Sequence, residues 1–216
     1  MVITINELIA NVGGEAMTPR ERRTVLLRDL LVGGRVIRGA HTGTPASERD
    51  TLYPVVGIRA LGEDGAVDHT AVERLAVRNE RDIERARIRA GDVLLSMRGQ
   101  FRAARADETC EGSILSQNLV ILRFRHGTDP ALMTEYFNSQ GGRDALAALA
   151  RGSALPILSI MALETLEVPA PGDETQKNLA ACLAAYREYE ALARQEASLT
   201  ARIKEALVAD YLGVRR

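Results

Sequence analysis

The chain has 216 residues, of which 46% are hydrophobic and 26% are charged, and its formal net charge at pH 7 is −1. These proportions are ordinary for a soluble globular protein, and the near-zero charge argues against a protein that adheres to nucleic acid through bulk charge alone. Aromatic residues make up only 4% and tryptophan is absent, which disfavours recognition by aromatic stacking.

The cysteines and the apolar segments indicate the compartment. Cys110 and Cys182 lie far apart and match no metal-ligand spacing, a usage that indicates a reducing cytosol. The N-terminus has no basic segment ahead of its apolar residues, so it does not resemble a signal peptide. No run approaches the roughly 18 apolar residues that would span a membrane. We therefore expect a soluble, cytoplasmic protein without a membrane partner.

The first 20 residues are interpreted as an N-terminal extension. Residues 1–12 read as a short amphipathic segment, and Thr18, Pro19 and Glu21 have the arrangement of a helix start.

In the next segment, "TVLLRDLLVGGRVIRG", strand and helix interpretations compete. A polar loop, "TGTPASERD", follows.

Residues 21–172 are expected to form a mixed α+β domain that is irregular and β-rich. Three segments rich in apolar and β-branched residues predict strands: "TLYPVVGIRAL", "GDVLLSMRG" and "SQNLVILRFRH". Asp129 as N-cap and Pro130 at the first position open a helix that is predicted to stop at Gly141-Gly142. A second, Ala-rich helix is predicted from about Arg143 to Arg151.

The stretch "GSALPILSIMALETLEVPAPGDETQKNLA", residues 152–180, places a loop, a short strand, a proline stop and a helix start in close succession. Pro169 and Pro171 cannot donate to a ladder or continue a helix, so they are predicted to end the strand "LETLEV". Asp173 is expected at the N-cap, with Gln176 reaching back to its backbone N–H. We interpret the stretch as a rigid junction that fixes the angle at which a long helix leaves the domain.

Residues 173–216 are expected to form a long spacer helix that pairs with another helix. Heptad spacing places Cys182, Tyr189, Glu196 and Ile203 at one seam position, and Ala185, Leu192, Leu199 and Ala206 at the other. A helix of about 60 Å is too long for a domain of this size to cover. We therefore predict a coiled coil with contacts at Tyr189, Leu192, Leu199 and Ile203, and the alternative is an amphipathic helix that packs on its own domain.

The junction resembles the boundary between a target recognition domain and a spacer helix in the specificity (S) subunits of type I restriction–modification enzymes. That family shows a Gly-Ser pair, an Ile-Ser segment, a short strand that ends in prolines, and a Gln that opens a long helix. The matching residues are Gly152, Ser153, Leu158, Ser159, Leu163, Val168, Pro169, Pro171 and Gln176.

Three upstream segments resemble the same family. "LLRDLLVGGRVIRG" is similar to its opening strand–helix, with Gly39 in the place of a recurring glycine, which favours a strand at Val25–Leu27. "RAGDVLLSMRGQ" and "SQNLVILR" resemble two further strands, so that the likeness covers about Thr24 to Leu212. It implies a half-subunit that pairs, as a homodimer or with another half-subunit, through antiparallel helices. Each recognition domain then reads one half of a bipartite site in double-stranded DNA.

Residues 85–105 carry six arginines against one acid, Asp92, which is a local charge of +5 and is typical of a DNA-facing surface. Three of these arginines, Arg85, Arg87 and Arg89, are explained equally well as ion-pair partners of the acids just before them. The better candidates follow a strand in a Gly-containing loop, and Arg and Gln pair bidentately with guanine and adenine. We predict DNA contacts from Arg98, Gln100, Arg102 and Arg105.

A second candidate loop, "RVIRGAHTGTPASER", offers Arg38, His41 and Arg49 as DNA contacts. Its hydroxyl residues Thr42, Thr44 and Ser47 suit either phosphate binding or turn formation. Gln117 and Asn118 open a strand, where capping of the strand edge and base contact are equally good explanations.

No motif for catalysis is recognised. The sequence has no "N/D-P-P-Y/F" methyltransferase signature, no Walker A loop and no restriction-type "E-x-K", and its three histidines show no metal-ligand spacing. We therefore expect no enzymatic activity, no cofactor and no metal in this chain. The resemblance implies that S-adenosylmethionine and ATP belong to partner subunits.

The expected function is a DNA sequence-recognition subunit that directs an adenine methyltransferase partner. The alternatives are a DNA-binding regulator or defence-system accessory that acts without a methyltransferase, and an interaction scaffold whose long helix is its purpose. The last alternative treats the arginines as solubilising residues only.

Overall fold

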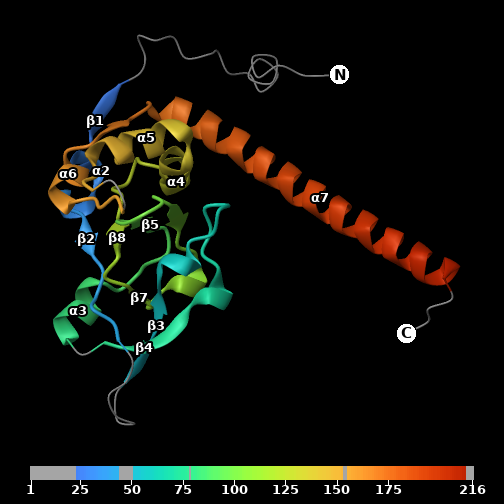
Figure 1. Ribbon diagram of the computed structural model, residues 1–216. Helices are drawn as coiled ribbons and strands as arrows, with labels where there is room; N and C mark the ends of the chain where they lie inside the picture. The colour runs from blue at the N-terminus through green and yellow to red at the C-terminus, as the bar shows by residue number, and fades with distance from the viewer. Residues whose placement is uncertain (1–22, 44–50, 78, 153–154, 213–216) are drawn as a thin grey trace. The chain divides into compact units, whose positions relative to one another are not determined.

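The computed structural model describes residues 23–43, 51–77, 79–152 and 155–212 (Figure 1). Residues 23–176 belong to one compact unit, and the helical residues from Lys177 onwards belong to a second. Some predictions lie outside the described residues, namely those for residues 1–20 and Glu21 and for Thr44, Ser47, Arg49 and Ser153.

The first unit is mixed α+β, as predicted, and its described strands form three small sheets with the orders β1-β9, β2-β8-β5-β6 and β4-β3-β7. Its strands are β1 (Thr24–Leu26), β2 (Ile37–Arg38), β3 (Leu52–Val56), β4 (Glu73–Ala76), β5 (Val93–Ser96), β6 (Ala103–Arg105), β7 (Ile114–Leu115), β8 (Leu119–Leu122) and β9 (Glu167–Pro169). Its helices are α2 (Leu27–Leu30), α3 (Glu80–Arg85), α4 (Pro130–Asn138), α5 (Gln140–Leu149) and α6 (Ile160–Glu164). Short 3₁₀ turns are η2 (Val32–Gly34), η3 (Ile58–Ala60), η4 (His69–Ala71) and η5 (Glu108–Cys110). The long helix α7 (Asp173–Tyr211) follows.

The four-stranded antiparallel sheet separates two hydrophobic cores. All residues of β5 and β8 are buried, and alternate side chains point to opposite faces. Leu94 and Ile121 join the core shared with β3 and β7. Leu95 and Val120 join the core that contains Phe137 of α4. Burial on both faces explains why these two segments are almost entirely apolar in the sequence, and both strand predictions are confirmed.

The predicted stop of the helix at Gly141-Gly142 is wrong. Helix α4 ends at Asn138, and both glycines lie in the first turn of α5. Ser139 caps that second helix, because its hydroxyl accepts a hydrogen bond of 3.1 Å from the backbone N–H of Gly142. A Cβ at Gly142 would lie 1.9 Å from the carbonyl oxygen of Tyr136. The glycine therefore permits close packing of consecutive helices and does not end one.

The strand predicted for "LETLEV" is wrong in its first half. Residues Ile160–Glu164 form α6, which Ser159 caps by accepting a hydrogen bond from Ala162 at 3.1 Å, and Leu163 is fully buried on this helix. The strand begins only at Glu167 and pairs antiparallel with β1, with Val168 opposite Val25. The strand predicted at Val25–Leu27 is confirmed with a shift of one residue, because α2 begins at Leu27.

Helix α7 begins at Asp173, so the N-cap predicted at Asp173 is wrong by one residue: the backbone N–H of Gln176 donates to the Gly172 carbonyl at 2.9 Å. The capping role predicted for the Gln176 side chain is also wrong. The Gln176 amide nitrogen donates to the carbonyl oxygens of Gly127 at 2.9 Å and Pro171 at 3.0 Å. Its amide oxygen accepts from the backbone N–H of Asp129 at 3.0 Å. Gln176 therefore ties the first turn of α7 to the loop that precedes α4.

A buried ion pair links the residue before β5 to the residue after β8. The Arg123 guanidinium donates to both carboxylate oxygens of Asp92, at 2.8 and 2.7 Å, and the side chains are 18% and 2% exposed. Asp92 also accepts a bond of 2.8 Å from the backbone N–H of Arg89. The bidentate geometry and the extra donor compensate for the removal of both charges from water.

We expect Arg123→Ala to lower the free energy of unfolding by about 3–5 kcal/mol, because it leaves the Asp92 carboxylate buried without its partner. Urea denaturation of the full chain measures this loss. The matched control is Arg59→Ala, which breaks an exposed ion pair with Glu73 and is expected to cost less than about 1 kcal/mol. Equal losses in the two variants would contradict the account.

Candidate nucleic-acid interface

Strand register brings three loops to one end of the four-stranded sheet. Ser96, the last residue of β5, lies opposite Leu119, the first residue of β8. Arg38, the last residue of β2, lies opposite Val120. The chain after Arg38, the turn 116–118 and the loop 97–102 therefore all leave the sheet at this end, which we call the loop end.

Backbone hydrogen bonds join these loops to one another. The N–H of Met97 donates to the Asn118 carbonyl at 3.0 Å, and the N–H of Gly39 donates to Leu119 at 3.1 Å. A Cβ at Gly39 would lie 2.0 Å from the carbonyl oxygen of Ser116, so only glycine allows the chain after β2 to approach the turn 116–118 this closely.

The loop 97–102 is held from three sides. Ser96 closes its base, because the Ser96 hydroxyl donates to the Gln100 carbonyl and accepts from the Arg102 N–H, both at 2.9 Å. Gly99 has φ 70° and its N–H donates to the Pro156 carbonyl at 3.0 Å. Phe101 is only 6% exposed and anchors the loop in the core. The loop is thus preorganised, as a recognition element needs to be.

Asn138, at the end of α4, fixes the strand that follows the loop. Its side-chain oxygen accepts from the N–H of Ala103 at 2.9 Å, and its side-chain nitrogen donates to the Ala103 carbonyl at 2.8 Å. These two bonds satisfy the backbone N–H and carbonyl of Ala103 at the edge of the sheet, as a neighbouring strand would. Asn138 is therefore a positioning residue for the loop 97–102, a role that no sequence pattern indicated.

Arg98 and Gln100 project into solvent from this loop, and Arg102 is partly buried. Within the described parts of the chain, the Arg98 side chain has no hydrogen-bond or ion-pair partner. Arg102 donates to Glu63 at 2.9 Å and to the Gln100 side-chain oxygen at 3.1 Å. A hollow of about 640 Å³ beside them is lined also by Asn138 and Arg143. Arg102, Arg143 and the amide of Gln100 therefore line one hollow together with the acids Glu63 and Asp144, whereas Arg98 lies outside its lining.

The other predicted DNA contacts divide between the two ends of the sheet. Arg38 and His41 are exposed, and they lie on the chain that leaves the loop end. Arg105 is exposed but lies opposite Val93, the first residue of β5. The structure therefore separates Arg105 from the loop residues by the length of β6, about 10 Å.

Two of the three arginines just before β5 make side-chain contacts within the domain. Arg85 forms an ion pair with Asp82 at 2.9 Å and donates to the carbonyl oxygens of Arg38 and Gly39. Arg87 lies 3.6 Å from Glu84. The explanation of Arg85 and Arg87 as partners of the preceding acids is confirmed, whereas Arg89 is exposed and forms no ion pair with a described residue.

The second unit is the helix α7 after residue 176. The helix has 39 residues, a length of about 59 Å, and no described residue of it is buried. The four predicted seam contacts are among its exposed apolar residues, namely Tyr189 at 68%, Leu192 at 59%, Leu199 at 46% and Ile203 at 60%. This apolar surface is available to another helix.

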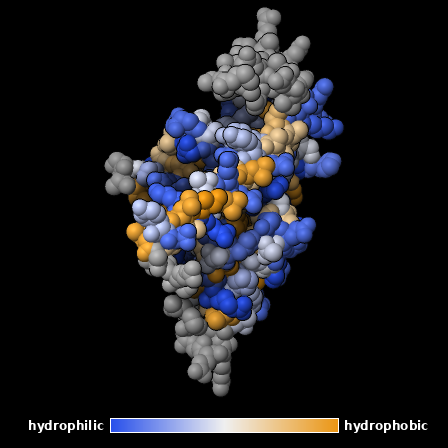
Figure 2. Space-filling view, turned by 90° about the vertical axis from the view of Figure 1, so that its right-hand side faces the viewer, coloured by the Kyte–Doolittle hydropathy of each residue, from blue (hydrophilic) through white to orange (hydrophobic). Residues whose placement is uncertain are grey.

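Hydrophobic and hydrophilic side chains are interspersed on the face shown in Figure 2. Among the described helices, none combines the length and the apolar character that crossing a lipid bilayer requires.

Known proteins were compared with the chain by sequence and by structure. No protein-family model matches the chain, and no curated protein matches it. The HsdS subunit from Thermoanaerobacter tengcongensis is similar in structure, with a TM-score of 0.61 and 20% identity over 91% of this chain and 50% of that one. A chain from a structural study of complex assembly and conformational transition of the type I R-M system has a TM-score of 0.62 and 19% identity.

The second likeness covers 92% of this chain and 50% of the other, so this chain spans about half the length of both solved structures. The likeness extends over most of the described fold, and it agrees with the resemblance found at the junction before α7. The chain therefore has the fold of about half of a type I restriction–modification specificity subunit.

Proposed function

We propose that this chain is a non-catalytic DNA sequence-recognition subunit of a type I restriction–modification system. Its compact domain reads one half of a bipartite site in double-stranded DNA and directs an adenine methyltransferase partner in the cytoplasm. S-adenosylmethionine and ATP are bound by partner subunits in this proposal.

The observation that carries the proposal is the braced loop 97–102. It presents Arg98, Gln100 and Arg102 from a preorganised backbone, and these are the residue types that pair bidentately with guanine and adenine edges. Arg38 and His41 leave the same end of the sheet and suit phosphate contacts that set the register on DNA.

The exposed apolar residues of α7 support pairing of two chains through this helix. The chain, with one compact domain and one long helix, matches about half the length of the solved structures that it resembles. Two copies that pair through antiparallel helices regenerate two domains with a fixed separation. A homodimer of this kind reads a symmetric site, because the twofold symmetry of the protein is imposed on the DNA.

The proposal is tested by co-expressing the full chain with a type I modification subunit from the same genome and mapping N6-methyladenine in the host DNA. We expect methylation at a bipartite sequence that depends on both proteins and is lost when Arg98 and Arg102 are replaced. Methylation without the chain, or unchanged methylation with the double variant, would contradict the assignment.

A further inference from the structure

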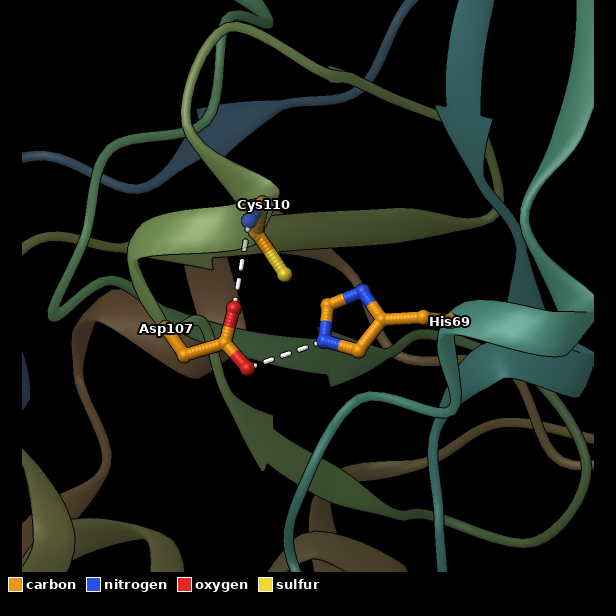
Figure 3. Close-up of side chains that lie close together, drawn as sticks. All are labelled: His69, Asp107 and Cys110. Carbon is orange, nitrogen blue, oxygen red and sulfur yellow. Dashed lines mark hydrogen bonds and ion pairs between the residues drawn. The ribbon is translucent and has the colours of Figure 1, made fainter.

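Two short turns bring together three side chains that the sequence keeps far apart. His69 lies in η4, whereas Asp107 and Cys110 lie at the start and end of η5, 38 and 41 residues further on. Each offers one possible metal-ligand atom, and these atoms all lie within 4.8 Å of one another (Figure 3). Sequence spacing did not indicate that these residues meet, because only the fold brings η4 beside η5.

The Asp107 carboxylate is held in place by its own turn. One oxygen accepts hydrogen bonds from the Thr109 hydroxyl and from the Cys110 N–H at 3.2 Å. The other oxygen lies 2.9 Å from Nε2 of His69. The Cys110 sulfur points towards the imidazole ring in Figure 3. The carboxylate is thus anchored through one oxygen and presents the other to the histidine and the thiol.

We propose that His69, Asp107 and Cys110 bind a zinc-class divalent cation, with water as the fourth ligand. Imidazole nitrogen, thiolate sulfur and carboxylate oxygen are all ordinary zinc ligands, and a sulfur ligand selects zinc over magnesium and calcium. Tetrahedral coordination at ordinary bond lengths separates ligand atoms by about 3.3–3.7 Å. The three ligand atoms lie up to 4.8 Å apart, so side-chain rotations would have to bring them about 1 Å closer together.

The site has an open side and a buried side. The His69 and Asp107 side chains are 44% and 54% exposed, so a hydrated ion reaches them from solvent, while Cys110 is only 1% exposed and forms the floor. Hydrogen bonds from Thr109 and His69 hold the pKa of Asp107 below its usual range, which keeps the carboxylate charged. Burial raises the pKa of the Cys110 thiol to about 11.

Coordination by Cys110 consequently requires loss of its proton. The S–H bond breaks, the sulfur–metal bond forms, and one proton passes to solvent for each ion bound. The bound ion would join η4 to η5 and so fasten two turns at the edge of the core formed around β3 and β7. Because the three ligands meet only in the folded chain, the ion is expected to stabilise the folded state by mass action.

The test is titration of the full, metal-free chain with Co²⁺, followed by calorimetry with Zn²⁺. We expect one ion per chain and a thiolate-to-cobalt charge-transfer absorption. His69→Ala and Cys110→Ser are expected to weaken Zn²⁺ binding by at least about tenfold, and Cys110→Ser to remove the absorption band. The matched controls are His126→Ala and Cys182→Ser, which remove the same chemical groups elsewhere and are expected to change neither.

Circular dichroism without metal checks that each variant is folded, and Cys110→Ala replaces the serine variant if a buried hydroxyl prevents folding. Absence of the charge-transfer band in the unaltered chain would overturn the proposal. So would a band that Cys182→Ser removes, or Zn²⁺ binding that survives both Cys110 variants. None of these results depends on whether the chain binds DNA.

Discussion

Replacing Arg98 and Arg102 together with alanine is expected to weaken DNA binding by at least about thirty-fold. A bidentate contact to the correct base is worth about 1–3 kcal/mol, so two contribute about 2–6 kcal/mol. The Arg98 side chain has no hydrogen-bond or ion-pair partner among the described residues, so its removal breaks no such contact between them. Loss of Arg102 breaks an exposed ion pair with Glu63, which costs little stability. The measurement is DNA affinity at several salt concentrations.

Arg105→Ala is the matched control for this double variant. Arg105 belongs to the same cluster of basic residues in the sequence but lies at the other end of β6, so we expect a small effect on affinity. We expect the double variant and Arg105→Ala to pair through α7 and to unfold at the same midpoint as the unaltered chain. An unaffected affinity in the double variant, or an equal loss from Arg105→Ala alone, would show that the loop assignment is wrong.

Leu192→Asp is expected to separate the paired chains while leaving each domain folded. Leu192 lies at the centre of the predicted seam and is 59% exposed in the single chain. Burial of a leucine contributes about 1.5–3 kcal/mol, and the substitution removes that contribution in both copies and places a charge in an apolar seam. Sedimentation analysis is expected to show a dimer for the unaltered chain and a monomer for the variant.

Ala191→Asp controls for the added charge, because position 191 lies off the heptad seam on the same exposed helix. It is expected to remain dimeric. A variant Leu192→Asp that is still dimeric would contradict the coiled-coil prediction, and a monomeric unaltered chain would contradict pairing of identical copies.

Sequence patterns predicted the parts of the fold that leave a mark in the local sequence. β5 and β8 are buried on both faces, and their sequences are accordingly apolar runs. Helix α7 starts after Pro171 because proline and glycine interrupt the chain there. In contrast, Gly142 and Gln176 were misread because their roles depend on partners that the local sequence does not reveal. Those partners are the Tyr136 carbonyl and the loop before α4.

The candidate interface was predictable to a similar extent. The loop could be proposed from the sequence, because it follows a recognisable strand and contains Gly99 among the polar residues Arg98, Gln100 and Arg102. The displacement of Arg105 depends on the β5–β6 register. Glu63 and Asn138 come from segments 39 and 35 residues from their partners in and beside the loop. No sequence spacing indicates such contacts, since only the fold brings these segments together.

The central claim, recognition of a bipartite site by paired chains, is tested most directly by selection from a random duplex DNA library with the purified full chain and its modification partner. We predict enrichment of two inverted half-sites separated by a spacer of fixed length and no fixed sequence. Enrichment of a single ungapped motif would contradict the pairing through α7. Salt-sensitive binding to all sequences, with no motif enriched, would contradict the recognition function itself.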